Sequence, residues 1–255
     1  MVKGLELFKE HFASYSKSYT LIGGIACMLS MEQAGLSFRA TKDLDIVLCI
    51  EALEKQFVED FWNFIKKANY QIRQRSSGKK IFYRFCNPTK SFYPEILELF
   101  SRKPDLICLK DNSHLTPIPV NEEVSSLSAI LLNDDYYKFI QEGKLTIDKL
   151  PIIGPTHLIP LKARAFLDLL AQSESGVHVD KKDIRKHRND IFRLYQLLSI
   201  NSHIHLPESI YQDMKIFFTL IKNDSSIDLK ALGLKNIKFD EMLSTLNSIY
   251  GLLSE

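Results

Sequence analysis

The sequence predicts an α+β fold, with strands and helices alternating in residues 1–154 and a helical domain in residues 155–255. Two observations support this division. Short β-branched and apolar runs alternate with amphipathic helical patterns in the first half, whereas the helical period dominates the second half. A segment with two prolines and one glycine, from Leu150 to Pro155, separates the halves.

The first half contains every predicted strand. Apolar residues spaced three and four apart predict helices at residues 2–14, 25–34, 54–68, 123–132 and 136–141, with Asp134 and Asp135 as a break and cap before the last. Strands are predicted at residues 19–22, 44–50, 81–86 and 95–100, with 106–109 as a further candidate. The run at 44–50, LDIVLCI, is typical of a strand buried on both faces.

The second half begins with an extended segment at residues 150–155. Thr156 is placed to cap a helix that runs to residue 171, and Asp180 is placed to cap the next helix. Two more helices are predicted at residues 208–222 and 239–252.

Composition and charge exclude several classes of protein. The net charge of +2 creates no global field that would attract DNA or an acidic membrane, so any nucleotide contact must come from a local basic patch. The four cysteines include no C-x-x-C pair, which argues against a zinc knuckle or a redox motif. The N-terminus has no signal-peptide pattern, and the longest apolar run is too short to span a membrane. We therefore expect a cytoplasmic protein with no membrane partner.

The strongest chemical signal is the pair Asp43 and Asp45 at the start of a predicted strand. Residues i and i+2 of a strand point to the same face, so these carboxylates lie side by side. Such a pair is costly without a cation, and Mg²⁺ is the usual partner of carboxylates and phosphates. A solvated strand end with no ligand would show the same spacing.

Gly23 and Gly24 stand between a predicted strand and a predicted helix. Backbone N–H groups at the start of a helix can bind a phosphate. A tight turn alone would also place two glycines here. Alone the two glycines are weak evidence, but they stand about 20 residues before the strand that carries Asp43 and Asp45, with an arginine and a threonine in between, and this combination is specific.

Gly23-Gly24 followed by Arg39-x-Thr41-x-Asp43-x-Asp45 resembles the first motif of the polymerase-β-like minimal nucleotidyltransferases, and in particular the AbiEii-type toxin family. The resemblance spans about residues 20–200. It implies a nucleotidyltransferase core with a mixed sheet flanked by helices, followed by a helical C-terminal domain. It also implies Mg²⁺, with two ions as one option, NTP as substrate, and a cognate antitoxin. Gly23, Gly24, Arg39 and Thr41 are then expected at the nucleotide.

The resemblance implies a third carboxylate on a neighbouring strand. Glu95 and Glu98 are the candidates, and their odd separation directs them to opposite faces of a regular strand. Glu98 lies between two leucines in mid-strand, where an unpaired carboxylate is least tolerated, whereas Glu95 follows Pro94 at the strand entrance. We therefore expect Asp43, Asp45 and Glu98 to be catalytic and to bind the metal.

The later motifs of the family imply Lys162, in an apolar helix, and Lys186 with Asp190 as further nucleotide-binding residues. Lys162 could instead extend to solvent, and Lys186 and Asp190, at i and i+4, could form an ordinary surface ion pair. The fourth motif, K-D-x-x-D-L-x-x-L, is only partly kept, because Asp190 matches its first acid and Arg193 replaces its second.

Together these features predict a Mg²⁺-dependent nucleotidyltransferase that moves NMP from an NTP to a hydroxyl of RNA, of a protein or of a small molecule. A toxin of a toxin–antitoxin or abortive-infection system is the main hypothesis. The alternatives are an antibiotic nucleotidyltransferase of the same fold and a catalytically inactive nucleotide-binding or scaffold module.

Overall fold

The computed structural model describes residues 2–52, 54–77, 80–101, 133–222, 224 and 226–252. The strand candidate at 106–109 and the helix predicted at 123–132 lie outside these residues. No helix in the described part of the chain combines the length and the apolar character that a membrane span requires.

The described strands form one seven-stranded sheet in the order β3-β4-β5-β2-β1-β7-β6. Their bounds are β1 Tyr19–Ile22, β2 Asp43–Leu48, β3 Gln71–Ser77, β4 Lys80–Cys86, β5 Ile96–Ser101, β6 Lys144–Ile147 and β7 Leu150–Ile153. The pairs β1–β7 and β2–β5 are parallel, and the other neighbouring pairs are antiparallel. The predicted mixed sheet is confirmed, although β3 and β6 were not predicted as strands.

The helices follow the predicted ranges closely. Their bounds are α1 Leu5–Phe12, α2 Gly23–Gln33, α3 Lys55–Ala68, α5 Asp134–Glu142, α6 Pro155–Glu174, α7 Lys181–Tyr195, α8 Glu208–Ile221 and α9 Phe239–Tyr250. Short 3₁₀ turns follow α1, at Ala13–Tyr15, and β2, at Ile50–Ala52. The structure is therefore α+β, with its described strands between residues 19 and 153 and only helices among the described elements after β7.

Two of the three predicted helix caps are wrong. The side chain of Asn133 caps α5, so Asp134 and Asp135 belong to the first turn of this helix. Carboxylates there interact favourably with the positive end of the helix dipole. Helix α6 begins at Pro155, after Gly154 and one residue before Thr156. Proline is favoured at the first helical position because an N–H group there would have no partner within the helix. The Asp180 cap is confirmed, since its carboxylate accepts a hydrogen bond from the Lys182 N–H at 2.8 Å.

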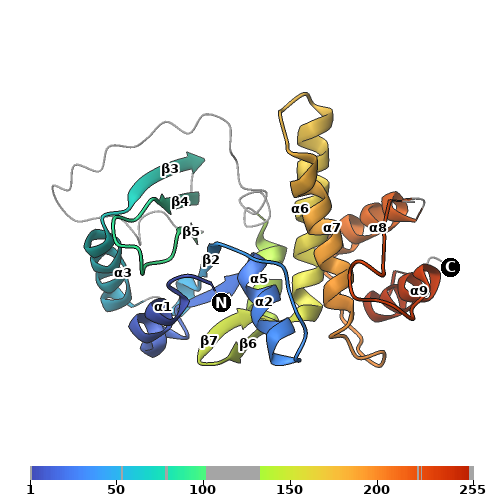
Figure 1. Ribbon diagram of the computed structural model, residues 1–255, viewed down its shortest axis with the longest axis horizontal. Coiled ribbons are helices and arrows are strands. Elements are labelled where there is room, and N and C mark those ends of the chain that lie inside the picture. Colours follow the sequence, from blue (N-terminus) through green and yellow to red (C-terminus); the bar gives the residue numbers. More distant parts are fainter. Residues whose placement is uncertain are drawn as a thin grey trace.

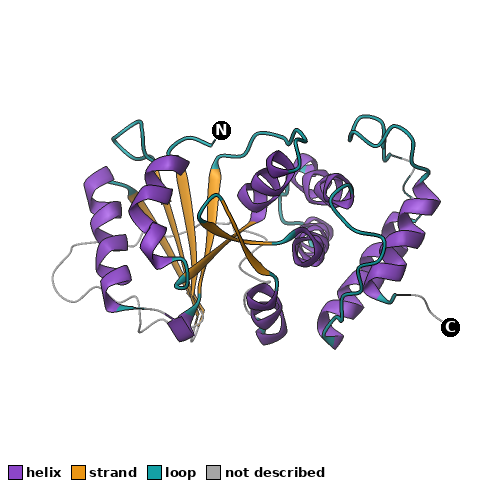
Figure 2. Ribbon diagram, turned by 90° about the horizontal axis from the view of Figure 1, so that it is seen from below, coloured by secondary structure: helices purple, strands orange, loops and turns teal. Residues whose placement is uncertain are grey.

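One face of the sheet is covered by α1 and α3, and the larger group of helices lies on the other side (Figure 2). Aromatic rings fill the first interface: Phe57 stacks on Tyr19, and Phe61 contacts Phe85 edge-on. Side chains alternate along a strand, so the neighbours of Phe85 and Tyr19 in sequence face the opposite side. On that side α6 and α7 lie together as a long helical hairpin (Figure 1).

Candidate active site

Gly23 and Gly24 form the junction between β1 and α2. Gly23 has φ +66°, and a Cβ atom there would lie 1.8 Å from Asp45 Oδ2. A Cβ atom on Gly24 would lie 2.5 Å from Thr41 Oγ1 and 3.7 Å from an Arg39 guanidinium nitrogen. The turn therefore packs its bare backbone against these three side chains, which only glycine permits.

Replacing Gly23 with alanine should abolish this approach. The methyl group would displace the Asp45 carboxylate, so we expect Gly23→Ala to weaken divalent-dependent NTP binding by more than about tenfold, a loss of at least ~1.4 kcal/mol. Isothermal titration calorimetry measures the change. Gly35→Ala is the matched control, since Gly35 has φ +72° and no atom within 4 Å of the added Cβ. Equal losses in both variants would mean that backbone strain alone is responsible.

Asp45 and Glu98 face each other on the parallel strands β2 and β5, whose register pairs the two residues. Their side chains share a hydrogen bond, and they are only 6% and 5% exposed. Asp43, two residues earlier on the same face, is half-buried and is paired in register with Ile96. Asp45 is also the register partner of Ile22, which leads directly into the glycine turn.

Burial and mutual repulsion perturb both buried carboxyls. Burial, with the charge of Asp43 as the second cause, raises the pKa of Asp45 to about 6. Burial, followed by the charge of Asp45, raises the pKa of Glu98 well above its ordinary value. The nearby cations do not offset this burial and repulsion, and a further cation between the two carboxyls would relieve the repulsion.

The donor atoms fit a hard divalent ion in kind, because Mg²⁺ prefers carboxylate oxygens together with phosphate and water. Among the described residues no three His, Cys, Asp or Glu side chains are grouped closely enough to hold a metal as they stand. Binding would therefore require the hydrogen bond between Asp45 and Glu98 to open, with Asp43, phosphate and water completing the coordination.

The two candidates for the third carboxylate lie in different surroundings. Glu98 is the third residue of β5, whereas Glu95 precedes the strand and is bound by Lys42 at 3.1 Å on the surface. The Glu95 side chain is 43% exposed. Only Glu98 is placed against Asp45.

Arg84, on β4, is a site neighbour whose contact with Glu98 the sequence did not reveal. It is the register partner of Glu98, and its guanidinium lies 3.5 Å from Glu98 Oε1. Burial and Asp45 raise the pKa of Glu98, and Arg84 opposes them. An arginine in a strand gives no sign of its cross-strand partner, because the register depends on tertiary pairing.

Asp190 is the centre of a second cluster, formed by the loop before β2 and by helices α6 and α7. Arg39 binds its carboxylate with two hydrogen bonds, at 2.9 and 2.6 Å, and Lys162 donates a third at 3.0 Å. Lys162 is 2% exposed and Asp190 is fully buried. Burial alone would raise the pKa of Asp190, but Lys162 and Arg39 lower it to about 2. The alternative in which Lys162 extends to solvent is therefore wrong.

Lys186 does not pair with Asp190. Its ammonium lies 3.5 Å from the exposed carboxylate of Asp183, one turn earlier on α7, and its side chain is half-buried, whereas Asp190 is fully buried. Lys186 nevertheless remains near the carboxylates, because its charge and that of Lys162 lower the pKa of Asp45 against the larger effect of burial.

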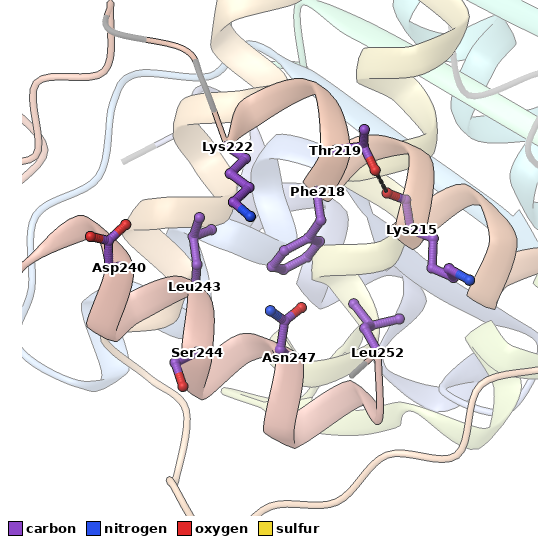
Figure 3. A pocket seen from close by; sticks show the side chains of 9 residues that line it. All are labelled: Lys215, Phe218, Thr219, Lys222, Asp240, Leu243, Ser244, Asn247 and Leu252. Carbon is purple, nitrogen blue, oxygen red and sulfur yellow. Dashed lines mark hydrogen bonds between the residues drawn. The ribbon is translucent and has the colours of Figure 1, made fainter. Parts of the chain in front are cut away.

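A groove of about 460 Å³ between α8 and α9 shares no residue with these clusters (Figure 3). Its floor is apolar and its rim carries the polar side chains of both helices, among them Lys215, Lys222 and Asp240. The site residues described above therefore all lie outside this groove.

No family model matches the sequence, and no curated protein matches it. Among solved structures, the chain is similar to an antigenic nucleotidyltransferase-like protein from Paracoccidioides brasiliensis, with 15% identity, 91% of each chain covered and a TM-score of 0.43. It is also similar to the Megavirus polyadenylate synthase, with 11% identity and a TM-score of 0.39 over 87% of this chain and 36% of that one. At these levels of similarity, neither structure assigns a residue or an activity to this chain.

Proposed function

We propose that this protein is a Mg²⁺-dependent nucleotidyltransferase that moves NMP from an NTP to an acceptor hydroxyl on RNA or protein. One observation carries the proposal: the glycine turn lies between the carboxylates of Asp45 and Glu98 and the group of cations around Asp190, called the Asp190 cluster below. Gly23 packs on Asp45, and Gly24 packs beside Arg39, which binds Asp190 together with Lys162. Carboxylates, bare backbone N–H groups and buried cations are the groups that a metal-bound triphosphate requires.

The glycine turn and the Asp190 cluster would hold the phosphates. Helix α2 begins at Gly23 with no side-chain cap, so the N–H groups of its first turn are available to phosphate oxygens. Arg39 and Lys162 would neutralise negative charge on the leaving pyrophosphate. Burial works against the charged form of Lys162, but Cys27 and Asp190 raise its pKa overall, so the ammonium stays charged.

Asp43, Asp45 and Glu98 would hold the metal and align the reacting atoms. A bound divalent ion polarises the phosphoryl oxygens and, where two ions bind, stabilises both the attacking and the leaving oxygen. The protein supplies no covalent nucleophile in this scheme, because phosphoryl transfer depends mainly on alignment and charge neutralisation.

The acceptor and the biological role rest on other features. Lys181, Lys182 and Arg185 are exposed along the first turns of α7, which favours an anionic acceptor over a cationic antibiotic. The toxin role, of the AbiEii type and with a cognate antitoxin, rests on the sequence motif alone. Incubation with each labelled NTP, Mg²⁺ and a cell extract tests the proposal, since transfer of label to RNA or protein is expected. Absence of transfer with all four NTPs would contradict it and favour a binding module.

NTP binding should depend on a divalent ion. The buried pair Asp45 and Glu98 repels phosphate unless a cation lies between them, so we expect affinity to fall by at least about tenfold when Mg²⁺ or Mn²⁺ is replaced by EDTA. Calorimetric titration with each NTP measures it. Undiminished affinity in EDTA would mean that these carboxylates do not hold a metal with the nucleotide.

A further inference from the structure

Arg193 lies one turn beyond Asp190 on α7, and its guanidinium is 3.6 Å from Asp190 Oδ1. Its side chain is 21% exposed, whereas Asp190 is fully buried. Arg193 and Arg39, whose side chain is 23% exposed, are therefore the two cations of the Asp190 cluster that reach solvent.

The Asp190 cluster has more positive than negative charge. Arg39, Lys162 and Arg193 are three cations around the single carboxylate of Asp190, so these four side chains sum to a charge of +2. Asp43 acts on Arg39, and Asp45 on Lys162, from outside this group. Several like charges held near one another in a partly buried place repel, and an anion between them would relieve the repulsion. The cluster is thus built to receive negative charge beyond that of Asp190.

The cluster also continues directly from the glycine turn. Arg39 lies 3.7 Å from the Cβ position of Gly24 and binds the same carboxylate that Arg193 touches. The positive groups therefore extend from the first turn of α2, through Arg39, to Arg193. An anion with several charged units in a row fits this arrangement better than a compact one.

We propose that Arg193 is a specificity-determining residue that binds the far end of a polyphosphate chain, so that the site selects three phosphates over two or one. This inference rests on the proposed function, because it assigns the triphosphate of the NTP to the cluster. In that arrangement the end nearest the carboxylates reacts, and the opposite end lies at Arg193.

Inorganic tripolyphosphate, pyrophosphate and phosphate test the inference without a base or an acceptor. In Mg²⁺ buffer, calorimetric titration of the full chain should show the tightest binding for tripolyphosphate. Arg193→Gln should weaken tripolyphosphate binding by about tenfold, the loss of one charge-assisted contact, and leave phosphate binding unchanged. Arg193→Lys should recover part of the difference, which also excludes a simple folding defect.

Lys222→Gln is the control, because Lys222 is an exposed cation at the α8–α9 groove, which shares no residue with the Asp190 cluster, and its loss should leave all three affinities unchanged. The inference is overturned if Arg193→Gln binds tripolyphosphate as the wild type does, if all three anions weaken equally, or if the wild type binds none of them. Failure of the proposed function looks different. Tripolyphosphate would then still bind through Arg193, but no labelled NTP would transfer its NMP.

Discussion

Glu98→Gln should lower the rate of nucleotidyl transfer by at least ~10²-fold, the scale of losing one preorganised electrostatic group in a transition state. The substitution keeps the shape and hydrogen-bonding capacity of Glu98 but removes the charge that would neutralise the metal. Glu98 is buried between Asp45 and Arg84. It is the one carboxylate in β5, so no other residue of this strand can replace it. Steady-state kinetics with label transfer measures the loss, and thermal unfolding should show that the fold is retained.

Glu95→Gln provides the comparison within the same segment. Glu95 is on the surface with Lys42, and such exposed ion pairs contribute little to stability. We therefore expect turnover close to wild type. The reverse outcome, a slow Glu95 variant and an active Glu98 variant, would move the metal from the β2–β5 pair to the sheet edge. If neither variant is slow, the nucleotidyltransferase proposal itself fails.

Most of the fold was predictable because its central strands carry a strong apolar signal. The predicted strand at 19–22 matches β1 in both bounds, and the apolar run at 44–50 differs from β2 by one or two residues. The two strands that were not predicted, β3 and β6, are the two edges of the sheet. An edge strand has one unpaired side and few buried positions, so its sequence can be as polar as a loop. Gln71–Ser77, QIRQRSS, is such a sequence.

The candidate site was predictable where it depends on local spacing and not where it depends on pairing between distant segments. The i, i+2 spacing of Asp43 and Asp45 and the adjacent glycines are local signals that a sequence displays directly. The bond from Arg39 to Asp190 joins residues 151 positions apart, and the contact of Arg84 with Glu98 depends on strand register. The expected pair of Lys186 and Asp190 shows the limit of spacing arguments. Both residues are on one helix, but burial of Asp190 gives it other partners.

Asp190→Asn should be the most destabilising of these substitutions. It leaves Lys162 and Arg39 charged beside a neutral amide, and breaking a buried ion pair from one side typically costs about 3–5 kcal/mol. The free energy of unfolding from urea titration should fall by that order. Asp183→Asn is the control on the same helix, because Asp183 is exposed and its ion pair within the described part of the chain is the one with Lys186, so its loss should be within about 1 kcal/mol. Similar losses in the two variants would mean that the Asp190 cluster adds little stability.

A second substitution identifies the origin of that loss. If the cost comes from an unpaired buried ammonium, Lys162→Met in the Asp190→Asn background should restore part of the stability, because methionine fills the volume without charge. Acid adds an independent test. The pKa of Asp190 is lowered from 3.8 to about 2 in the folded protein, so its contribution is complete above pH of about 4 and is lost as pH falls toward 2. The wild type should therefore lose stability over this interval more steeply than Asp190→Asn, which has no carboxylate to protonate there.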